Sequence, residues 1–376
     1  MLGLETVPCI IADDLTPEQI RAFRLADNKV GELAEWDFAK LEAELAELTA
    51  FDVDMTAFGF DESIFDDEAP DEGEALEENR ESLQERFIVP PFSVLDTRQG
   101  YWQDRKNVWK KIIKSDIGRA EGLLGGGLKE LAEKHGSNLT GTSIFDPVLC
   151  EVLISWFCPP GGKVLDPFAG GSVRGLVSVL MGNEYTGIDL SEKQIKANKA
   201  NYKKIAGRQD LNGNDLNAPV WINDDSANID LLVSEKHDFL LTCPPYADLE
   251  VYSDDPRDIS NMPYNEFRAA YKEILFKAAD KLKENAFVAI VVGEVRDKHG
   301  FYYNFVGDTI DVCRYAGLKY YNECILLNQI ATAAMRAGKQ FDAARKVCKT
   351  HQNVLVFVKG DPRKVKVGEY EYENIS

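Results

Sequence analysis

Several familiar patterns are missing from this sequence of 376 residues. Its seven cysteines are scattered, with no CxxC pair and no spacing typical of a zinc site. We therefore expect free thiols in a reducing cytoplasm, no disulfide framework and no metal site. The sequence also has no basic segment followed by an apolar stretch at its start, and no apolar run of membrane-spanning length. These absences predict a soluble protein of the cytoplasm with no membrane partner.

Basic residues are scarce relative to acidic ones, and the net charge is −20. The acidic excess is confined to the N-terminal part. Residues 1–86 hold 25 Asp and Glu against 6 Lys and Arg, whereas residues 87–376 hold 38 against 37. The larger part is nearly neutral and can carry local basic patches, so the net charge does not exclude a nucleic acid as partner.

The length allows one large α/β domain and a smaller module. Residues 1–60 are expected to form a small helical unit, in which Thr16 caps a helix and Pro17 takes its first position. Residues 61–86 are mostly Asp, Glu and small polar residues, which predicts a solvated linker. The large domain is assigned to residues 87–360 and a tail to residues 361–376.

Basic and aromatic residues alternate just after the linker. Residues 98–119 contain seven Lys and Arg against two Asp, interleaved with Tyr101, Trp102 and Trp109. Such interleaving suits phosphate contacts and base stacking. The alternative is an ordinary amphipathic helix with a solvated basic face. Residues 336–349 form a second basic stretch that could contact phosphate. The candidate DNA-contacting residues are Arg98, Arg105, Lys106, Lys110, Arg336, Lys339 and Arg345.

From about residue 142 apolar strands alternate with helices. We expect strands over residues 163–165, 185–188, 239–242, 287–292 and 353–358. We expect helices over residues 147–157, 172–181, 191–205 and 264–282. This alternation predicts an α/β fold with a mostly parallel sheet and helices on both faces, whose ligands bind beyond the carboxyl ends of the strands.

The first motif that carries chemistry is Val164-Leu-Asp-Pro-Phe-Ala-Gly-Gly-Ser172, an apolar strand that ends in Asp166 and a glycine turn. Glycine has no Cβ, so the backbone there can approach a ligand closely. The next strand ends about twenty residues later in Asp189, where an acid can accept hydrogen bonds from both ribose hydroxyls. An NAD site would need GxGxxG, which Gly170-Gly-Ser-Val-Arg-Gly175 does not fit.

The second motif, Asp238-Phe-Leu-Leu-Thr-Cys-Pro-Pro-Tyr246, is an apolar strand that ends in a rigid Pro-Pro step and an aromatic ring. In this order, and roughly seventy residues apart, the two motifs resemble motifs I and IV of the S-adenosylmethionine-dependent amino-methyltransferases that act on DNA bases. The resemblance covers about residues 87–360. It implies a Rossmann-like methyltransferase fold, S-adenosylmethionine as cofactor and double-stranded DNA as partner.

Among these enzymes, the phage-type DNA methylases fused to a ParB-like N-terminus look most similar. Val7-Pro8 and Arg24-Leu-Ala-Asp-Asn28 resemble the C-terminal end of a ParB-like domain. The part of that domain that would hold its nucleotide or DNA site is missing. We therefore expect a truncated segment that packs on the enzyme, with a module for a protein partner or DNA as the alternative. No endonuclease motif is visible, which favours a stand-alone modification enzyme in a bacterial or phage-infected cell.

The resemblance assigns the cofactor site residue by residue. Ser143-Ile-Phe-Asp-Pro147 matches motif X, which helps to hold the methionine end of the cofactor. Val220-Trp-Ile-Asn-Asp-Asp-Ser226 resembles motif III, where an acid faces the adenine amino group. Asp225 is the preferred acid and Asp224 its rival. The candidate cofactor-binding residues are Phe145, Asp146, Asp166, Phe168, Gly170, Gly171, Asp189 and Asp225.

The substrate implied by the resemblance is difficult to methylate, because the lone pair of an exocyclic base amine is delocalised into the ring. The family draws on the amine hydrogens with a backbone carbonyl and the side chain before Pro-Pro, while an aromatic ring stacks on a base turned out of the duplex. The prolines fix φ and remove competing donors. The candidate catalytic residues are Thr242, Cys243, Pro244, Pro245 and Tyr246.

Cys243 departs from the family, which usually has Asp, Asn or Ser at this position. A thiol is a weak acceptor, so the Pro244 carbonyl is expected to carry more of the activation, with Thr242. Cys is closest in shape to Ser, and the Ser form goes with cytosine N4, which favours cytosine slightly over adenine N6. The carbon-5 cytosine methyltransferases use a cysteine as covalent nucleophile, but theirs follows the proline of a Pro-Cys-Gln step, whereas Cys243 precedes Pro-Pro-Tyr.

Two alternative functions stay open: an RNA base amino-methyltransferase, and a non-catalytic DNA-binding protein built on a decayed methylase.

Overall fold

The computed structural model describes residues 86–113, 144–246, 253, 255–328 and 333–367. The expectations for residues 1–60, for nearly all of the linker and for the end of the tail lie outside these residues. The strands are β1 (Val94–Asp96), β2 (Lys163–Asp166), β3 (Glu184–Asp189), β4 (Val220–Asn223), β5 (His237–Thr242), β6 (Leu282–Val292), β7 (Lys319–Leu327) and β8 (His351–Lys359). The main helices are α4 (Gly100–Ile112), α6 (Pro147–Phe157), α7 (Val173–Leu180), α8 (Glu192–Lys203), α9 (Ile229–Leu232), α10 (Tyr264–Asp280), α11 (Phe305–Tyr315) and α12 (Ala333–Ala344).

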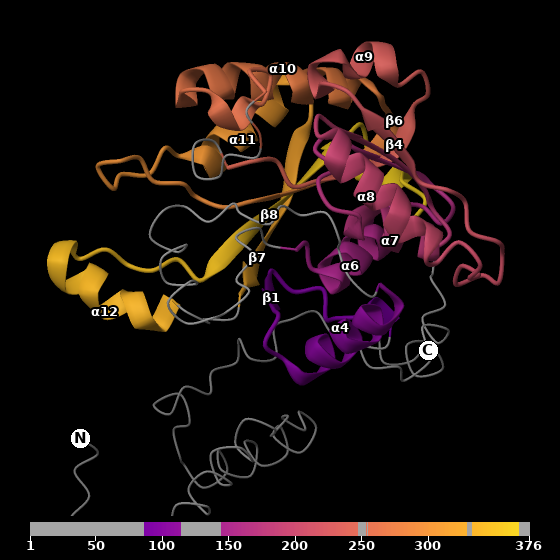
Figure 1. The fold of residues 1–376 in the computed structure, drawn as a ribbon, viewed down its shortest axis with the longest axis horizontal. Helices are drawn as coiled ribbons and strands as arrows, with labels where there is room; N and C mark the ends of the chain where they lie inside the picture. Colours follow the sequence, from indigo (N-terminus) through magenta and orange to yellow (C-terminus); the bar gives the residue numbers. More distant parts are fainter. Residues whose placement is uncertain (1–85, 114–143, 247–252, 254, 329–332, 368–376) are drawn as a thin grey trace, which may run out of the picture. The chain divides into compact units, whose positions relative to one another are not determined.

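The described strands form one sheet in the order β1-β7-β8-β6-β5-β2-β3-β4. Every neighbouring pair is parallel except the two that involve β8, which runs antiparallel to β6 and to β7. Helices connect successive parallel strands and cover both faces (Figure 1). The predicted fold class, a Rossmann-like α/β fold with a mostly parallel sheet, is confirmed.

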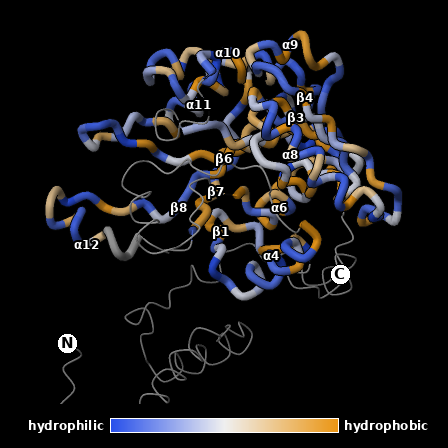
Figure 2. The backbone as a smooth tube through the Cα atoms, viewed as in Figure 1, coloured by the Kyte–Doolittle hydropathy of each residue, from blue (hydrophilic) through white to orange (hydrophobic). Residues whose placement is uncertain are grey.

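Alternate residues of the strands face two separate hydrophobic cores. On β6, Phe287, Ala289 and Val291 belong to the core under α4, α6 and α7. Val288 and Ile290 belong to the core under α9, α10 and α11. Because successive side chains of a strand point to opposite faces, β6 is apolar at every position of this stretch, as a strand buried on both sides must be. Figure 2 shows the hydrophobic colouring gathered along such central strands.

The strand order reverses between β2 and β5, because β3 and β4 lie on one side of β2 while β5 and β6 lie on the other. The carboxyl ends of these parallel strands lie at one edge of the sheet. Since β8 is antiparallel, its first residues reach the same edge: Asn353 pairs with Val292 of β6, and His351 pairs with Leu327 of β7. Open α/β sheets bind ligands at such a reversal point.

Candidate functional site

The buried carboxylate of Asp166 joins the two sequence motifs at the reversal point. It lies at the end of β2 with no exposed surface. Its Oδ1 accepts hydrogen bonds from Thr242 Oγ1 at 2.7 Å and from the Phe168 backbone N–H at 3.2 Å. Its Oδ2 accepts from Arg174 Nε at 2.6 Å and from the Tyr185 hydroxyl at 2.8 Å. Asp166 therefore fixes the segment Phe168-Ala-Gly-Gly-Ser172, here called the glycine loop, to the end of β5. The contact of Asp166 with the cofactor stays a prediction.

Arg174 supports the glycine loop from inside the protein. Its Nη2 donates to the carbonyl oxygens of Phe168 at 2.7 Å and Ala169 at 3.1 Å. Its guanidinium lies 4.7 Å from the centre of the Phe145 ring. Burial is the largest single influence and acts to lower the pKa of Arg174, but Asp166, Tyr185 and Cys243 together raise this pKa above its ordinary value. The prediction from sequence missed this residue, although an arginine within the apolar helix α7 has to be paired if it is buried.

The glycine loop is also fixed to the end of β3. Gly170 has a φ of 51°, in the left-handed region that favours glycine. Its N–H donates to Asp189 Oδ2 at 2.8 Å, while Asp189 Oδ1 accepts from the Ser191 N–H at 2.8 Å. The buried Asn198 of α8 donates to the Gly170 carbonyl at 2.8 Å. The Asp189 carboxylate is thus held in one orientation beside Gly170 and Gly171.

Two acids follow β4, and a buried hydroxyl holds them near the same loop. Asp225 caps the short turn at residues 226–228, where its carboxylate accepts a backbone N–H at 2.9 Å. The Asp224 carboxylate accepts from Asn228 Nδ2 at 3.1 Å, and this hydrogen bond lowers the pKa of Asp224. The Ser226 hydroxyl donates to the Pro167 carbonyl. Both acids are half-buried, so both remain candidates for the adenine contact.

The loop after β5 is oriented by a residue that lies far away in the sequence. Gln352, near the start of β8, donates through Nε2 to the Tyr246 hydroxyl at 2.7 Å. The same hydroxyl lies 4.0 Å from the Cys243 Sγ. The Tyr246 ring meets the Phe305 ring edge-on, with centres 6.1 Å apart. The half-buried Tyr246 ring therefore has a defined direction at the carboxyl edge, and Gln352 is a site residue that the prediction from sequence missed.

The candidate motif X residue Asp146 lies where α4 meets α6. It caps α6 by accepting the Val148 N–H at 2.9 Å. Its other oxygen accepts from Lys106 Nζ at 2.7 Å and from Trp102 Nε1 at 3.4 Å. These bonds bring Lys106 into an ion pair within the protein, where it positions α4 against α6. Contacts from Asp146 to a cofactor and from Lys106 to DNA stay predictions.

Helix α4 corrects the expectation that its aromatic residues stack on bases. The side chains of Trp102 and Trp109 are buried, at 0% and 1% exposure. Trp109 Nε1 donates to the buried Glu151 carboxylate at 2.7 Å, and Arg105 donates to both oxygens of that carboxylate. The expectation of base stacking was therefore wrong for both tryptophans, while contact of the basic residues of α4 with DNA stays a prediction. Seven residues apart, the two rings share one helix face, and that face packs into the core.

The remaining basic candidates lie on the surface. Arg98 follows β1 at the carboxyl edge and forms an ion pair of 2.7 Å with Asp96. The exposed basic candidates are Lys110, Lys339 and Arg345. Arg336 belongs to α12, but its side chain lies outside the described residues. Contact of these residues with DNA stays a prediction.

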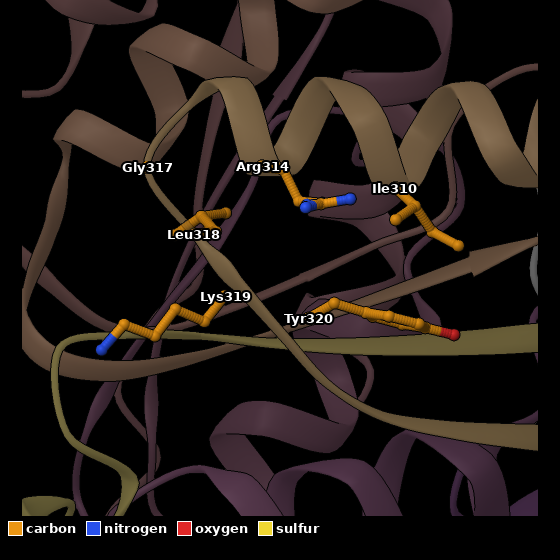
Figure 3. Close-up of a pocket in the computed structure, with 6 residues that line it drawn as sticks. All are labelled: Ile310, Arg314, Gly317, Leu318, Lys319 and Tyr320. Carbon is orange, nitrogen blue, oxygen red and sulfur yellow. The ribbon is translucent and has the colours of Figure 1, made fainter.

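A hollow of about 540 Å³ lies at the opposite edge of the sheet, where β7 begins (Figure 3). Lys319, the first residue of β7, pairs there with Val358 near the end of β8, whose first residues lie at the carboxyl edge. The hollow is lined by Ile310, Arg314, Gly317, Leu318, Lys319 and Tyr320. It contains no residue of the sequence motifs, so the motif loops and not this hollow define the candidate site.

The described part of the chain shows neither a metal cluster nor a membrane-spanning helix. It contains no group of three or more His, Cys, Asp or Glu side chains that could hold a metal ion. None of its helices is both long and apolar enough to span a bilayer. The six cysteines of this part form no disulfide with one another.

No family model and no curated protein matches this sequence. Solved structures do match. TrmN from Thermus thermophilus has a TM-score of 0.38 and 16% identity, over 57% of this chain and 48% of that chain. A methyltransferase from Pyrococcus furiosus has a TM-score of 0.38 and 15% identity, over 69% of this chain and 98% of that chain. Magnesium protoporphyrin IX methyltransferase from Synechocystis PCC 6803, solved with bound S-adenosylmethionine, has a TM-score of 0.36 and 12% identity, over 68% of this chain and 90% of that chain. The match thus spans about half the length of the Thermus protein.

Proposed function

We propose that this protein transfers a methyl group from S-adenosylmethionine to the exocyclic amine of a DNA base, with cytosine N4 favoured over adenine N6. The hydrogen bond between Thr242 and Asp166 carries the proposal. It joins the Cys-Pro-Pro-Tyr loop to the glycine loop at the point where the strand order reverses. Ligands of open α/β sheets bind at this point. A cofactor held by one loop would therefore meet a base held by the other.

The residues at the ends of β2, β3 and β4 suit the nucleoside part of this cofactor. Asp189, oriented by the N–H groups of Gly170 and Ser191, would accept hydrogen bonds from the ribose hydroxyls. Asp224 or Asp225 would accept from the adenine amine. Gly170 adopts a positive φ that favours glycine and has no Cβ, so the backbone there could approach the ligand closely. When bound, S-adenosylmethionine supplies an electrophilic methyl group on its sulfonium.

The loop after β5 supplies the groups that would hold the base. The amine lone pair is delocalised into the ring, so an acceptor has to draw on the amine hydrogens before the nitrogen becomes nucleophilic. The Pro244 carbonyl is that acceptor, and the Cys243 thiol is a weaker one. Neither proline has an N–H that would compete for the acceptor. The Tyr246 ring, directed by Gln352, would stack on a base turned out of the duplex.

Methyl transfer can be tested with the full-length protein and cofactor labelled in its methyl group, using duplex DNA of mixed sequence and total tRNA in parallel. We expect label in the DNA and N4-methylcytosine after digestion to nucleosides. Label in tRNA alone would replace DNA with RNA as the substrate. Cofactor binding without label in either would indicate a non-catalytic protein.

The proposed ribose contact is tested separately with Asp189→Ala, whose affinity for S-adenosylmethionine is measured by calorimetric titration. Loss of a charge-assisted hydrogen bond is worth about 1.5–3 kcal/mol, or tenfold or more in the dissociation constant. A folded variant that binds the cofactor as tightly as the wild type would remove Asp189 from the ribose site.

A further inference from the structure

The segment between β6 and α11 forms a tight hairpin over residues 295–303, here called the 295–303 hairpin. Arg296 and Tyr302 form an antiparallel bridge. The Tyr303 N–H donates to the Val295 carbonyl at 3.0 Å, and the Asp297 N–H donates to the Phe301 carbonyl at 2.8 Å. Figure 1 shows this segment projecting from the sheet on the side from which α12 also projects. It follows the carboxyl end of β6 directly.

The tip of the hairpin is organised by its own polar groups. The Asp297 carboxylate accepts from the N–H groups of His299 at 2.9 Å and Phe301 at 2.8 Å. The N–H of Phe301 contributes most to a lowered pKa of Asp297. Gly300 has a φ of 92°, and its carbonyl accepts from Arg296 Nη1 at 2.7 Å. The turn is thus pre-organised, so a partner that binds it loses little conformational freedom in ordering it.

This rigid turn exposes aromatic and basic side chains. Phe301 is 73% exposed and Tyr302 is 47% exposed. The Arg296 guanidinium lies 3.8 Å from the centre of the Tyr302 ring. Lys298 and His299 are exposed beside them. Because hydrogen bonds hold the backbone of the turn, Phe301 stays exposed on it.

Both ends of the hairpin lie against the candidate catalytic ring. A Cβ added to Gly293, just before the hairpin, would come 3.7 Å from the Tyr246 ring. Phe305, just after it, meets that ring edge-on at 6.1 Å. Where the two ends of the hairpin meet, the Glu294 carboxylate accepts hydrogen bonds from the N–H groups of Phe305 at 3.1 Å and Val306 at 3.2 Å. The hairpin therefore begins and ends beside Tyr246.

We propose that the 295–303 hairpin contacts duplex nucleic acid beside the target base, with Phe301 packed against a neighbouring base and Lys298 near the phosphates. This inference rests on the proposed function and deepens it by naming an element that holds the substrate. A base turned out of the duplex leaves the π-face of its neighbour uncovered, where an aromatic ring can pack, and exposed cations suit a polyanion. The one carboxylate of the tip, Asp297, is bonded to the backbone of the turn.

The test measures binding of a fluorescein-labelled duplex of mixed sequence by fluorescence anisotropy at fixed salt. Phe301→Ala should weaken binding about tenfold, because stacking of a base on an aromatic ring is lost. Phe301→Trp should bind as tightly as the wild type. The matched control is Tyr315→Ala, which removes a ring that is 63% exposed at the far end of α11 and should leave binding unchanged.

A second arm tests the charge. Lys298→Ala should weaken binding. It should also make the plot of the logarithm of the association constant against the logarithm of salt concentration less steep by about one, as expected for a lost phosphate contact. Because no methyl transfer is measured, failure of the proposed reaction would not affect this result. Duplex binding that is undetectable in the wild type, or equal in the wild type and the folded Phe301→Ala variant, would overturn the inference.

Discussion

Oγ1 of Thr242 donates a hydrogen bond of 2.7 Å to Oδ1 of Asp166, and this bond fixes the last residue of β5 to the last residue of β2. Both side chains are fully buried. The two loops that follow these strands therefore start from one rigid junction. The pairing of β2 with β5 and this side-chain contact at their ends together set where the two loops begin.

We expect Thr242→Val to damage both stability and methyl transfer. Valine has nearly the same shape but cannot donate, so Asp166 loses one of its hydrogen bonds without a change in packing volume. Loss of a partner for a buried carboxylate costs about 1–3 kcal/mol. Urea unfolding and the rate of label transfer measure the two effects. Thr242→Ser restores the donor and is the control. A Val variant with the wild-type rate would show that the junction is not needed for the reaction.

We expect Gln352→Met to impair use of the DNA substrate while leaving cofactor affinity unchanged. Methionine keeps the length of the side chain but cannot donate to the Tyr246 hydroxyl, so the ring loses its fixed direction. Tyr246→Phe removes the same bond from its other end. If the two residues act through this bond, the double variant should be no worse than the poorer single variant in kcat/KM. Strictly additive losses would separate their roles.

We expect Cys243→Ser to retain or raise activity, because a hydroxyl accepts hydrogen bonds better than a thiol. If Cys243 were instead a covalent nucleophile, the serine variant would be nearly inactive. A duplex with fluorinated cytosine would then trap the wild type as an adduct that resists denaturation. Gel electrophoresis under denaturing conditions distinguishes the two mechanisms, and we expect no adduct.

We expect His237, at the start of β5, to make the fold less stable in mild acid. Burial lowers the pKa of His237, and its Nδ1 is buried without a hydrogen-bond partner. The unfolded chain therefore binds a proton more readily than the folded one. The contribution to stability is complete above the unfolded pKa of about 6.5 and is lost as the pH falls below it. Urea unfolding at a series of pH values should show a smaller decline for His237→Gln than for the wild type.

The features that could be predicted from the sequence are local ones. The apolar strands around Val164 and Phe239 and the glycines after Asp166 each occupy a few consecutive residues. Parallel strands end at one edge of a sheet, so the juxtaposition of Asp166 and Thr242 follows once both strands are recognised. The fold class and the principal loops therefore needed no information from distant parts of the chain.

The features that the sequence did not reveal depend on distant partners or lack an apolar pattern. Gln352 and Tyr246 are 106 residues apart, and nothing near either residue indicates the other. The first five residues of β7 are exposed, so it does not show the alternation of a half-buried strand. The spacing of Trp102 and Trp109 did indicate a single helix face. The basic residues between them made an exposed, DNA-contacting face look equally reasonable.

The antiparallel strand β8 has a consequence for the order in which the protein becomes active. It comes last in the sequence among the described strands, yet it lies between β6 and β7. As the chain is synthesised, the glycine loop and the Cys-Pro-Pro-Tyr loop emerge long before Gln352. Until β8 inserts, β6 and β7 lack their common neighbour and Tyr246 lacks the donor that directs its ring. Insertion of β8 thus joins β6 to β7 and brings the Gln352 donor to Tyr246 in the same step.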